Sequence, residues 1–265
     1  MYGPLTLAFK YLRYLFTAAN GKGHGVHSPF VFEFITRVLN DNRRFYVFDG
    51  IEKIRMQLLS NHNSITIQDF GAGLRVAKTN TRKISDVAKS SLKPSKYSQL
   101  LFRMIDYYGP EQIIELGTSL GITTAYLASA NTAAKVTTFE GSKAIAQIAR
   151  QNHGSLGLAN ISLLEGNFDE QLPQWIVNNK RLDFAFIDGN HLYKPTVAYF
   201  EALLDIVEDH SILVFDDIHW SKGMEEAWAQ ISGHPRVTLS IDLFFIGIVF
   251  FRKEFAQKQQ VSIRF

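Results

Sequence analysis

Hydrophobic positions in the first 60 residues recur at helical spacing. Apolar side chains return every three or four positions over residues 5–19, and the pattern resumes over residues 29–39 and 48–60. Three glycines within residues 21–25 interrupt it, because glycine is costly inside a helix. The opening segment therefore predicts three helices, with a glycine-rich hinge between the first and the second.

The pattern weakens between residues 61 and 93. Residues 65–70 resemble a short strand, residues 69–73 contain two glycines, and a basic stretch rich in Ser, Thr and Asn follows. We expect a long loop with residues 69–73 as a candidate lid, and a short helix over residues 84–91. Pro94 then opens another helix, which ends at Gly109.

Regular alternation of strands and helices begins after Pro110. Strands are expected at residues 112–116, 135–140, 161–165, 182–188, 211–216, 237–241 and 244–251, and helices at 122–130, 143–153, 171–178, 196–208 and 223–231. Such alternation indicates a parallel sheet with right-handed crossovers. Only Asp242 and Leu243 separate the last two strands, which permits a hairpin but no crossover. We therefore predict an α/β fold with a Rossmann-like, seven-stranded, mostly parallel sheet that ends in an antiparallel hairpin.

Charge divides the chain at about the same place as the pattern. Residues 1–110 carry 16 Lys/Arg and 7 Asp/Glu, a net +9, and residues 111–265 carry 12 and 18, a net −6. A basic half can face nucleic acid, anionic lipid or an anionic substrate, although a solvated surface is the commoner reason. We expect a helical, basic N-terminal extension (1–110), an α/β domain (111–252) and a C-terminal tail (253–265).

Composition narrows the class of protein. The chain has no cysteine, which excludes disulfides and thiolate metal sites. No run of 18 apolar residues predicts a transmembrane helix, and the N-terminus lacks the pattern of a signal peptide. We expect a cytoplasmic protein.

The first strand of the alternating region leads into a glycine turn. Residues 115–121 read Glu-Leu-Gly-Thr-Ser-Leu-Gly at a strand-to-helix junction. Gly117 lets the backbone approach a ligand, and Gly121 lets the following helix pack closely. The next strand ends at Glu140, 19 residues after Gly121, where an acidic side chain can accept both ribose hydroxyls of an adenosine. A dinucleotide enzyme shares that glutamate, but the Gly-x-Gly-x-x-Gly sequence of such enzymes is absent.

Carboxylates follow the fourth and fifth strands. Asp188 ends the fourth strand and the pair Asp216-Asp217 ends the fifth. The carboxyl ends of adjacent parallel strands converge on one crevice, where three carboxylates repel unless a cation or proton intervenes. An all-oxygen set suits Mg²⁺, and the alternative is that the aspartates cap a helix without a metal. His191 and His219 follow these acids and are the candidate general bases.

These motifs resemble class I S-adenosylmethionine (SAM) dependent methyltransferases over residues 112–251. The whole chain is similar to a group of uncharacterised bacterial SAM-dependent methyltransferases, and the catalytic domain to metal-dependent O-methyltransferases of the catechol and caffeoyl-CoA type. The resemblance implies a SAM site made by Glu115, Gly117, Thr118, Ser119, Gly121, Glu140, Gly141, Asn167, Phe168 and Asp188. It also implies metal ligation by Asp188, Asp216 and Asp217, and places the general base at His191, with His219 as its rival.

The expected activity is methyl transfer from SAM to an oxygen of a small-molecule acceptor. Whether a divalent metal such as Mg²⁺ assists the reaction is left open. Catalytic roles fall to Asp188, His191 and His219. Two other classes stay open. One is an RNA methyltransferase, suggested by the +9 half, and the other is a non-catalytic SAM-binding protein. A homodimer is also left open.

Overall fold

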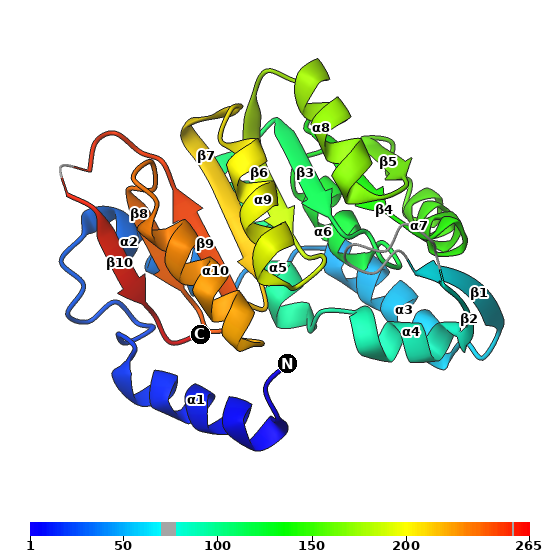
Figure 1. Ribbon diagram of the computed structural model, residues 1–265, viewed down its shortest axis with the longest axis horizontal. Helices are drawn as coiled ribbons and strands as arrows, with labels where there is room; N and C mark the ends of the chain where they lie inside the picture. The colour runs from blue at the N-terminus through cyan, green and yellow to red at the C-terminus, as the bar shows by residue number, and fades with distance from the viewer. Residues whose placement is uncertain (70–77, 256) are drawn as a thin grey trace. The chain divides into compact units, whose positions relative to one another are not determined.

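The computed structural model describes residues 1–69, 78–255 and 257–265, which form two compact units (Figure 1). The central unit spans Asn42–Trp175, and the terminal unit combines Met1–Asp41 with Ile176–Phe265. Each unit has its own strands and its own helices.

Three parallel strands form the sheet portion of the central unit, in the order β3 (Gln112–Leu116), β4 (Lys135–Glu140) and β5 (Ile161–Glu165). The strands are connected by α6 (Ile122–Ala130) and α7 (Lys143–Ser155). All carboxyl ends lie at one edge because the strands are parallel, and Glu140 is in register with Glu165.

Helices cover these strands. α3 (Val47–Ser60) and α5 (Ser95–Tyr108) pack against α6, and α4 (Ile84–Ser91) packs against α3. The shared core is strongly aromatic, with Phe48 and Phe102 rings 4.9 Å apart and Tyr126 buried beside them. This core is what fixes the start of α6, directly after the glycine turn.

A small antiparallel ribbon joins β1 (Ser64–Asp69) to β2 (Lys78–Lys83). The loop expected over residues 78–83 is therefore wrong: these residues pair with β1. Their sequence, Lys-Thr-Asn-Thr-Arg-Lys, has no apolar alternation that could have announced a strand. Of the candidate lid at residues 69–73, Asp69 ends β1, and residues 70–73 lie outside the described residues.

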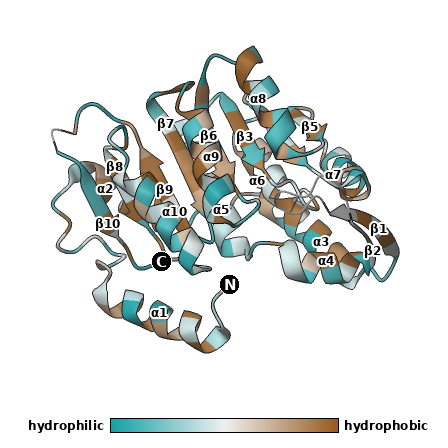
Figure 2. Cartoon of the chain, viewed as in Figure 1, coloured by the Kyte–Doolittle hydropathy of each residue, from teal (hydrophilic) through white to brown (hydrophobic). Residues whose placement is uncertain are grey.

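The strands of the terminal unit run in the order β10-β8-β9-β7-β6. Their bounds are β6 (Leu182–Ile187), β7 (Val207–Asp216), β8 (Leu239–Asp242), β9 (Ile246–Phe250) and β10 (Gln259–Ser262). β6 and β7 are parallel, whereas β9 is antiparallel to both β7 and β8. β9 and the second half of β7 are coloured as hydrophobic in Figure 2, and their residues are buried. α9 (Tyr193–Leu203) and α10 (Lys222–Gly233) pack against each other, in front of these strands in Figure 1.

The amino-terminal helices belong to the same unit. α1 (Pro4–Thr17) precedes α2 (Pro29–Phe34), which continues as a π-helical turn over Ile35–Leu39. Phe30 and Phe34 of α2 meet the ring of Phe250 on β9, at 5.1 and 6.4 Å. The predicted helix over residues 29–39 is thus present, with its last turn widened.

The predicted α/β fold with mostly parallel strands and an antiparallel hairpin near the C-terminus is confirmed. β10 adds a strand inside the expected tail, parallel to β8. The helix after β6 ends at Leu203 instead of residue 208, because β7 already begins at Val207. α8 (Phe168–Asn178) begins three residues earlier than expected. Among the described residues, no helix has the length and hydrophobicity needed to cross a membrane.

Candidate active site

The glycine turn after β3 has the backbone that its sequence predicts. Gly117 and Gly121 have φ angles of 111° and 80°, and Ser119 between them has 47°. At Gly121 a Cβ atom would collide with Nε2 of His153 and lie 3.0 Å from Cβ of Ala149 on α7. Glycine is therefore required here both for conformation and for close packing.

His153 of α7 packs against the glycine turn and forms a hydrogen bond with it. Its Nε2 lies 3.0 Å from the carbonyl oxygen of Gly121, to which the neutral ring donates. Burial lowers the pKa of His153 to about 4, although the contact with Gly121 opposes this. The imidazole is therefore neutral at physiological pH and acts as part of the scaffold.

Glu115, at the end of β3, is fully buried beneath the turn. Its Oε2 accepts hydrogen bonds from the hydroxyls of Thr124 and Thr138, the latter at 2.6 Å. The hydroxyls of Thr118 and Thr138 are also 2.6 Å apart. Glu115 thus ties the turn to β4 and α6.

Glu140 ends β4 next to the same turn. Its Oε2 accepts from the backbone N–H of Ser119 at 2.9 Å, and its Oε1 from that of Ser142 at 2.9 Å. Burial raises the pKa of Glu140 to about 7, although backbone N–H groups of Ser142, Ser119 and Gly141 oppose the shift. This carboxyl group is therefore poised between its two protonation states and is held beside the glycine turn.

The residues after β5 take mixed roles. Gly166 donates its N–H to the carbonyl oxygen of Glu140 at 3.0 Å, which brings the ends of β4 and β5 together. Oδ1 of Asn167 accepts from the N–H of Asp169 at 3.1 Å, so this side chain caps α8. Phe168, the first residue of α8, is half-buried. Of the two, Phe168 is the better candidate for stacking on a ligand.

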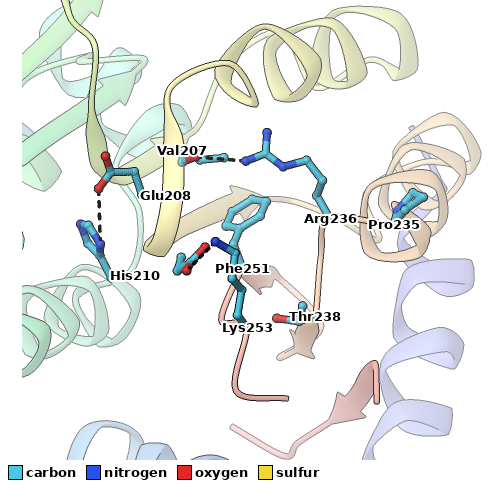
Figure 3. Close-up of a pocket in the computed structure, with 9 residues that line it drawn as sticks. Val207, Glu208, His210, Pro235, Arg236, Thr238, Phe251 and Lys253 are labelled. Carbon is cyan, nitrogen blue, oxygen red and sulfur yellow. Dashed lines mark hydrogen bonds and ion pairs between the residues drawn. The ribbon is translucent and has the colours of Figure 1, made fainter. Parts of the chain in front are cut away.

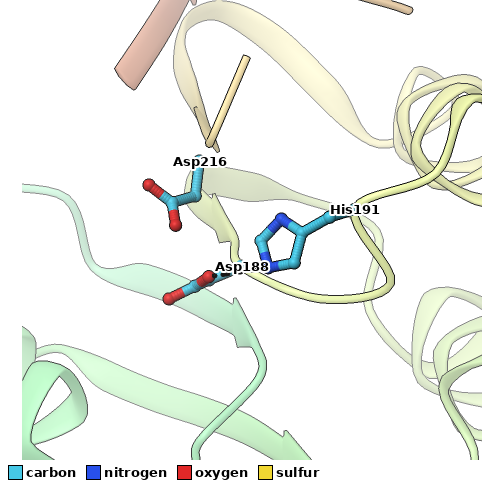
Figure 4. A group of neighbouring side chains, drawn as sticks. All are labelled: Asp188, His191 and Asp216. Carbon is cyan, nitrogen blue, oxygen red and sulfur yellow. Dashed lines mark ion pairs between the residues drawn. The ribbon is translucent and has the colours of Figure 1, made fainter. Parts of the chain in front are cut away.

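In the terminal unit, Asp188, His191 and Asp216 form a compact cluster (Figure 4). One ligand atom from each residue lies within 4.8 Å of the others. Asp188 follows β6 directly and Asp216 ends the parallel neighbour β7. The convergence expected at the carboxyl ends of two strands is therefore present in this unit.

Within this cluster His191 is paired with Asp188, whose Oδ1 lies 3.4 Å from Nε2 of the ring. Burial by itself lowers the pKa of His191. Asp188, with smaller contributions from Asp216 and Asp217, has the opposite effect and outweighs burial, so that the pKa is raised to about 8. The imidazole is thus oriented by one carboxylate and surrounded by two more. Asp217, a predicted metal ligand, acts on His191 through its charge and lies outside the group of three.

Asp217 instead occupies the turn after β7. Its φ angle is 53°, its N–H donates to the carbonyl oxygen of Phe245 at 2.7 Å, and its carbonyl oxygen accepts from Trp220. The donor set at the cluster is therefore two carboxylates and one imidazole. Such a set fits a divalent cation, and the imidazole favours Mn²⁺ or a later transition metal over Mg²⁺.

His219, the rival base, lies in a different environment. Its Nδ1 lies 3.0 Å from Oε1 of Glu225, its Nε2 lies 2.9 Å from Oδ2 of Asp242, and its ring stacks on Phe244 at 5.0 Å. Burial lowers the pKa of His219, but hydrogen bonds and charge from Asp242 and Glu225 give a net rise. Because both ring nitrogens are engaged, His219 links α10 to β8 and is poorly placed to take a proton from an acceptor.

A cavity of about 670 Å³ lies at the other end of β7 (Figure 3). It is lined by Val207, Glu208, Asp209, His210, Pro235, Arg236, Thr238, Phe251 and Lys253. Arg236 donates to the carbonyl oxygens of Leu204 and Val207, and Lys253 pairs with Asp209 at 3.0 Å. The basic groups of this cavity are thus already engaged, and it lies at the end of the strand remote from Asp216.

Sequence reasoning missed several supporting side chains. It did not assign roles to His153 under Gly121, to Thr124 and Thr138 around Glu115, or to Ser91, whose hydroxyl lies 2.7 Å from that of Ser119. Each acts on a residue distant in sequence, and no local spacing signals such a contact. His191 was proposed as a base, and its membership of the candidate metal cluster was not foreseen.

Comparison with known proteins gives one family match, over part of the chain. Residues 114–218 match a family model described as a methyltransferase domain. No curated protein matches the sequence.

Solved structures share the fold at low sequence identity. An O-methyltransferase from Bacillus cereus in complex with SAH matches with a TM-score of 0.54 and 21% identity, covering 83% of this chain and 96% of that one. The O-methyltransferase TomG from Streptomyces achromogenes, in complex with SAM, gives 0.53 and 18%, covering 61% and 82%. A protein assigned as a caffeoyl-CoA O-methyltransferase from Staphylococcus aureus gives 0.55 and 20%, covering 63% and 88%. At these identities the likeness concerns the fold.

Proposed function

We propose that the chain transfers the methyl group of SAM to an oxygen atom of a small-molecule acceptor, since residues 114–218 match a family model described as a methyltransferase domain. The observation that carries the proposal is Glu140 at the end of β4, hydrogen-bonded to Ser119 of the glycine turn. An acidic side chain in this position can accept hydrogen bonds from the ribose hydroxyls of an adenosine. The glycines let the backbone of the turn approach the ligand closely. The bound SAM and SAH of two structures with this fold support the same choice of cofactor.

The roles in the central unit follow from the contacts already described. Glu140 receives the ribose, and Gly117, Thr118, Ser119 and Gly121 form the turn that accommodates the rest of the donor. Gly141, Asn167 and Phe168 flank the adenine. Glu115, fully buried, holds the turn in place from beneath. The sulfonium already activates the methyl group, so the protein's main tasks are alignment of the two reactants and removal of one proton.

His191 is assigned as the general base. The acceptor oxygen attacks the methyl carbon, the bond between that carbon and sulfur breaks, and SAH leaves. The hydroxyl proton passes to Nδ1 of His191, because Nε2 is turned to Asp188. Asp188 then stabilises the imidazolium, and Asp216 and Asp217 add to the same effect.

The cluster also fits a divalent metal. Asp188, His191 and Asp216 would hold the ion. A bound cation supplies Lewis acidity, which lowers the pKa of a coordinated hydroxyl. In that case His191 would serve as a ligand, and Asp217 would be the remaining carboxylate beside the site.

Calorimetric titration with SAM, SAH and NAD tests the proposal. We expect SAM and SAH to bind at micromolar affinity and NAD not to bind. Glu140→Ala should lose the ribose contacts, whereas Glu111→Ala, at the opposite end of β3, should bind SAH normally. Unchanged SAH affinity in Glu140→Ala would refute the donor site.

A further inference from the structure

One face of α1 exposes large apolar side chains to solvent. The exposed fractions are 88% for Leu5, 71% for Phe9, 53% for Leu12 and 85% for Phe16. Their spacing of four, three and four residues places them on a single side of the helix. We call these four residues the α1 stripe.

The opposite face anchors α1 firmly. Tyr14 and Ala18 are buried in a cluster with Phe244, and the rings of Tyr14 and Phe244 are 5.3 Å apart. Near the start of the chain, Tyr2 and Lys10 both reach Glu225 on α10, at 2.7 and 3.0 Å. The α1 stripe is therefore presented outward by a helix that is held in place, and its exposure does not reflect a detached segment.

The segment that carries the α1 stripe has basic residues and no acidic ones. The first acidic residue of the chain is Glu33, and Lys10, Arg13 and Lys22 precede it; of these, Lys10 pairs with Glu225 on α10. Arg13 and Lys22 are exposed, and Arg13 directly follows Leu12. An apolar stripe flanked by basic residues on a surface helix is the pattern that binds anionic lipid headgroups while inserting its apolar side chains below them.

A second copy of the chain fits the α1 stripe less well. A helix of 14 residues is about 21 Å long and about 10 Å wide, so its face offers roughly 200 Å², against about 800 Å² per partner in a stable interface. Two such faces would also bring Arg13 of both copies close together, and α1 itself has no acidic residue to pair with it. A lipid surface needs no large complementary area.

We propose that the α1 stripe docks the protein on an anionic membrane surface. This is independent of the methyl donor and places the protein peripherally on the bilayer. Four side chains are available for insertion, and the helix would lie parallel to the bilayer plane.

Flotation of the full chain with lipid vesicles tests the proposal. We expect vesicles of phosphatidylglycerol and phosphatidylcholine to bind at least about tenfold more protein than phosphatidylcholine alone, and salt to weaken binding. Phe9→Ser/Phe16→Ser should lower binding at least about tenfold. The matched control is Tyr46→Ser/Met56→Ser, which removes two side chains exposed by 90% and 64% in the central unit and should bind normally.

A charge variant keeps the test meaningful if the serine substitutions disturb folding. Arg13→Glu retains all four apolar side chains and should lose the preference for phosphatidylglycerol. Absence of wild-type binding to anionic vesicles, or equal binding by the Phe9/Phe16 variant and its control, overturns the proposal. So does light scattering that shows a dimer which the Phe9/Phe16 variant splits, without vesicle binding by either protein.

Discussion

Oε2 of Glu140 accepts a hydrogen bond from the backbone N–H of Ser119 at 2.9 Å, which joins the end of β4 to the glycine turn after β3. Burial holds the pKa of this carboxyl group at about 7. The proposed ribose acceptor is therefore only partly ionised at neutral pH before a ligand binds.

This predicts proton-linked SAH binding. Ribose hydroxyls donate to the ionised carboxylate, so binding lowers the pKa of Glu140 and releases a proton below about pH 7. Affinity should accordingly rise with pH up to about 7 and level off above it. Calorimetry at pH 5.5 to 8.5, in buffers of different ionisation enthalpy, measures both effects. The Glu140→Gln variant should bind more weakly without this dependence, and the same slope in that variant would assign the proton to another group.

A second prediction compares two glycines with similar φ angles. Gly109 has φ of 62° and nothing within 4 Å of a Cβ atom, whereas Gly121 has φ of 80° and would meet His153 and Ala149. Gly109→Ala should cost about 1 kcal/mol of unfolding free energy, the strain of a left-handed alanine. Gly121→Ala should cost about 2–3 kcal/mol more, because overpacking adds to the strain. Urea denaturation of both variants measures the difference, and equal costs would show that α7 yields freely.

Substitutions of His191 and His219 should have different effects on turnover and on stability. His191→Gln should lower turnover on the order of 10²–10⁴-fold and leave SAH affinity intact, as expected for a lost general base. His219→Gln should keep most turnover and lose about 1–2 kcal/mol of stability, because Glu225 and Asp242 each lose a partner. Turnover, SAH titration and thermal unfolding of both variants provide the comparison. Normal turnover in His191→Gln together with loss in His219→Gln would move the base to His219.

Metal binding is tested at Asp216. If Asp188, His191 and Asp216 hold a divalent ion, activity should vanish with excess chelator and return with Mn²⁺ or Mg²⁺. Direct titration with Mn²⁺ should show one site, weakened at least about tenfold in Asp216→Asn. Full activity in excess chelator would leave these residues as acid-base groups only.

The sequence predicted the parts of the site that depend on local spacing. The glycine turn over residues 115–121 and Glu140 at a strand end follow from the strand-helix alternation, and the family match over residues 114–218 confirms the methyltransferase resemblance drawn from them. The positions of Asp188 and Asp216 at the ends of β6 and β7 were likewise expected.

Contacts between residues far apart in the sequence could not be predicted from local sequence patterns. The pairing of β2 with β1 depends on main-chain hydrogen bonds, and β2 itself is wholly polar and has no hydrophobic pattern. β10, Gln-Gln-Val-Ser, is just as featureless, although it pairs with β8. The two carboxylates that engage His219 lie 6 and 23 residues away, so its position two residues after Asp217 could not show that both ring nitrogens have partners.

The central claim is methyl transfer from SAM to an acceptor oxygen, and carbon-13 NMR of the reaction tests it most directly. The full chain would be incubated with SAM labelled in its methyl group and a pool of phenolic and other hydroxylated small molecules. We predict a new O-methyl resonance in step with SAH release, lost in both Glu140→Ala and His191→Gln. Label that appears only on nitrogen or on added RNA, or SAM binding with no transfer to any acceptor, would contradict the account.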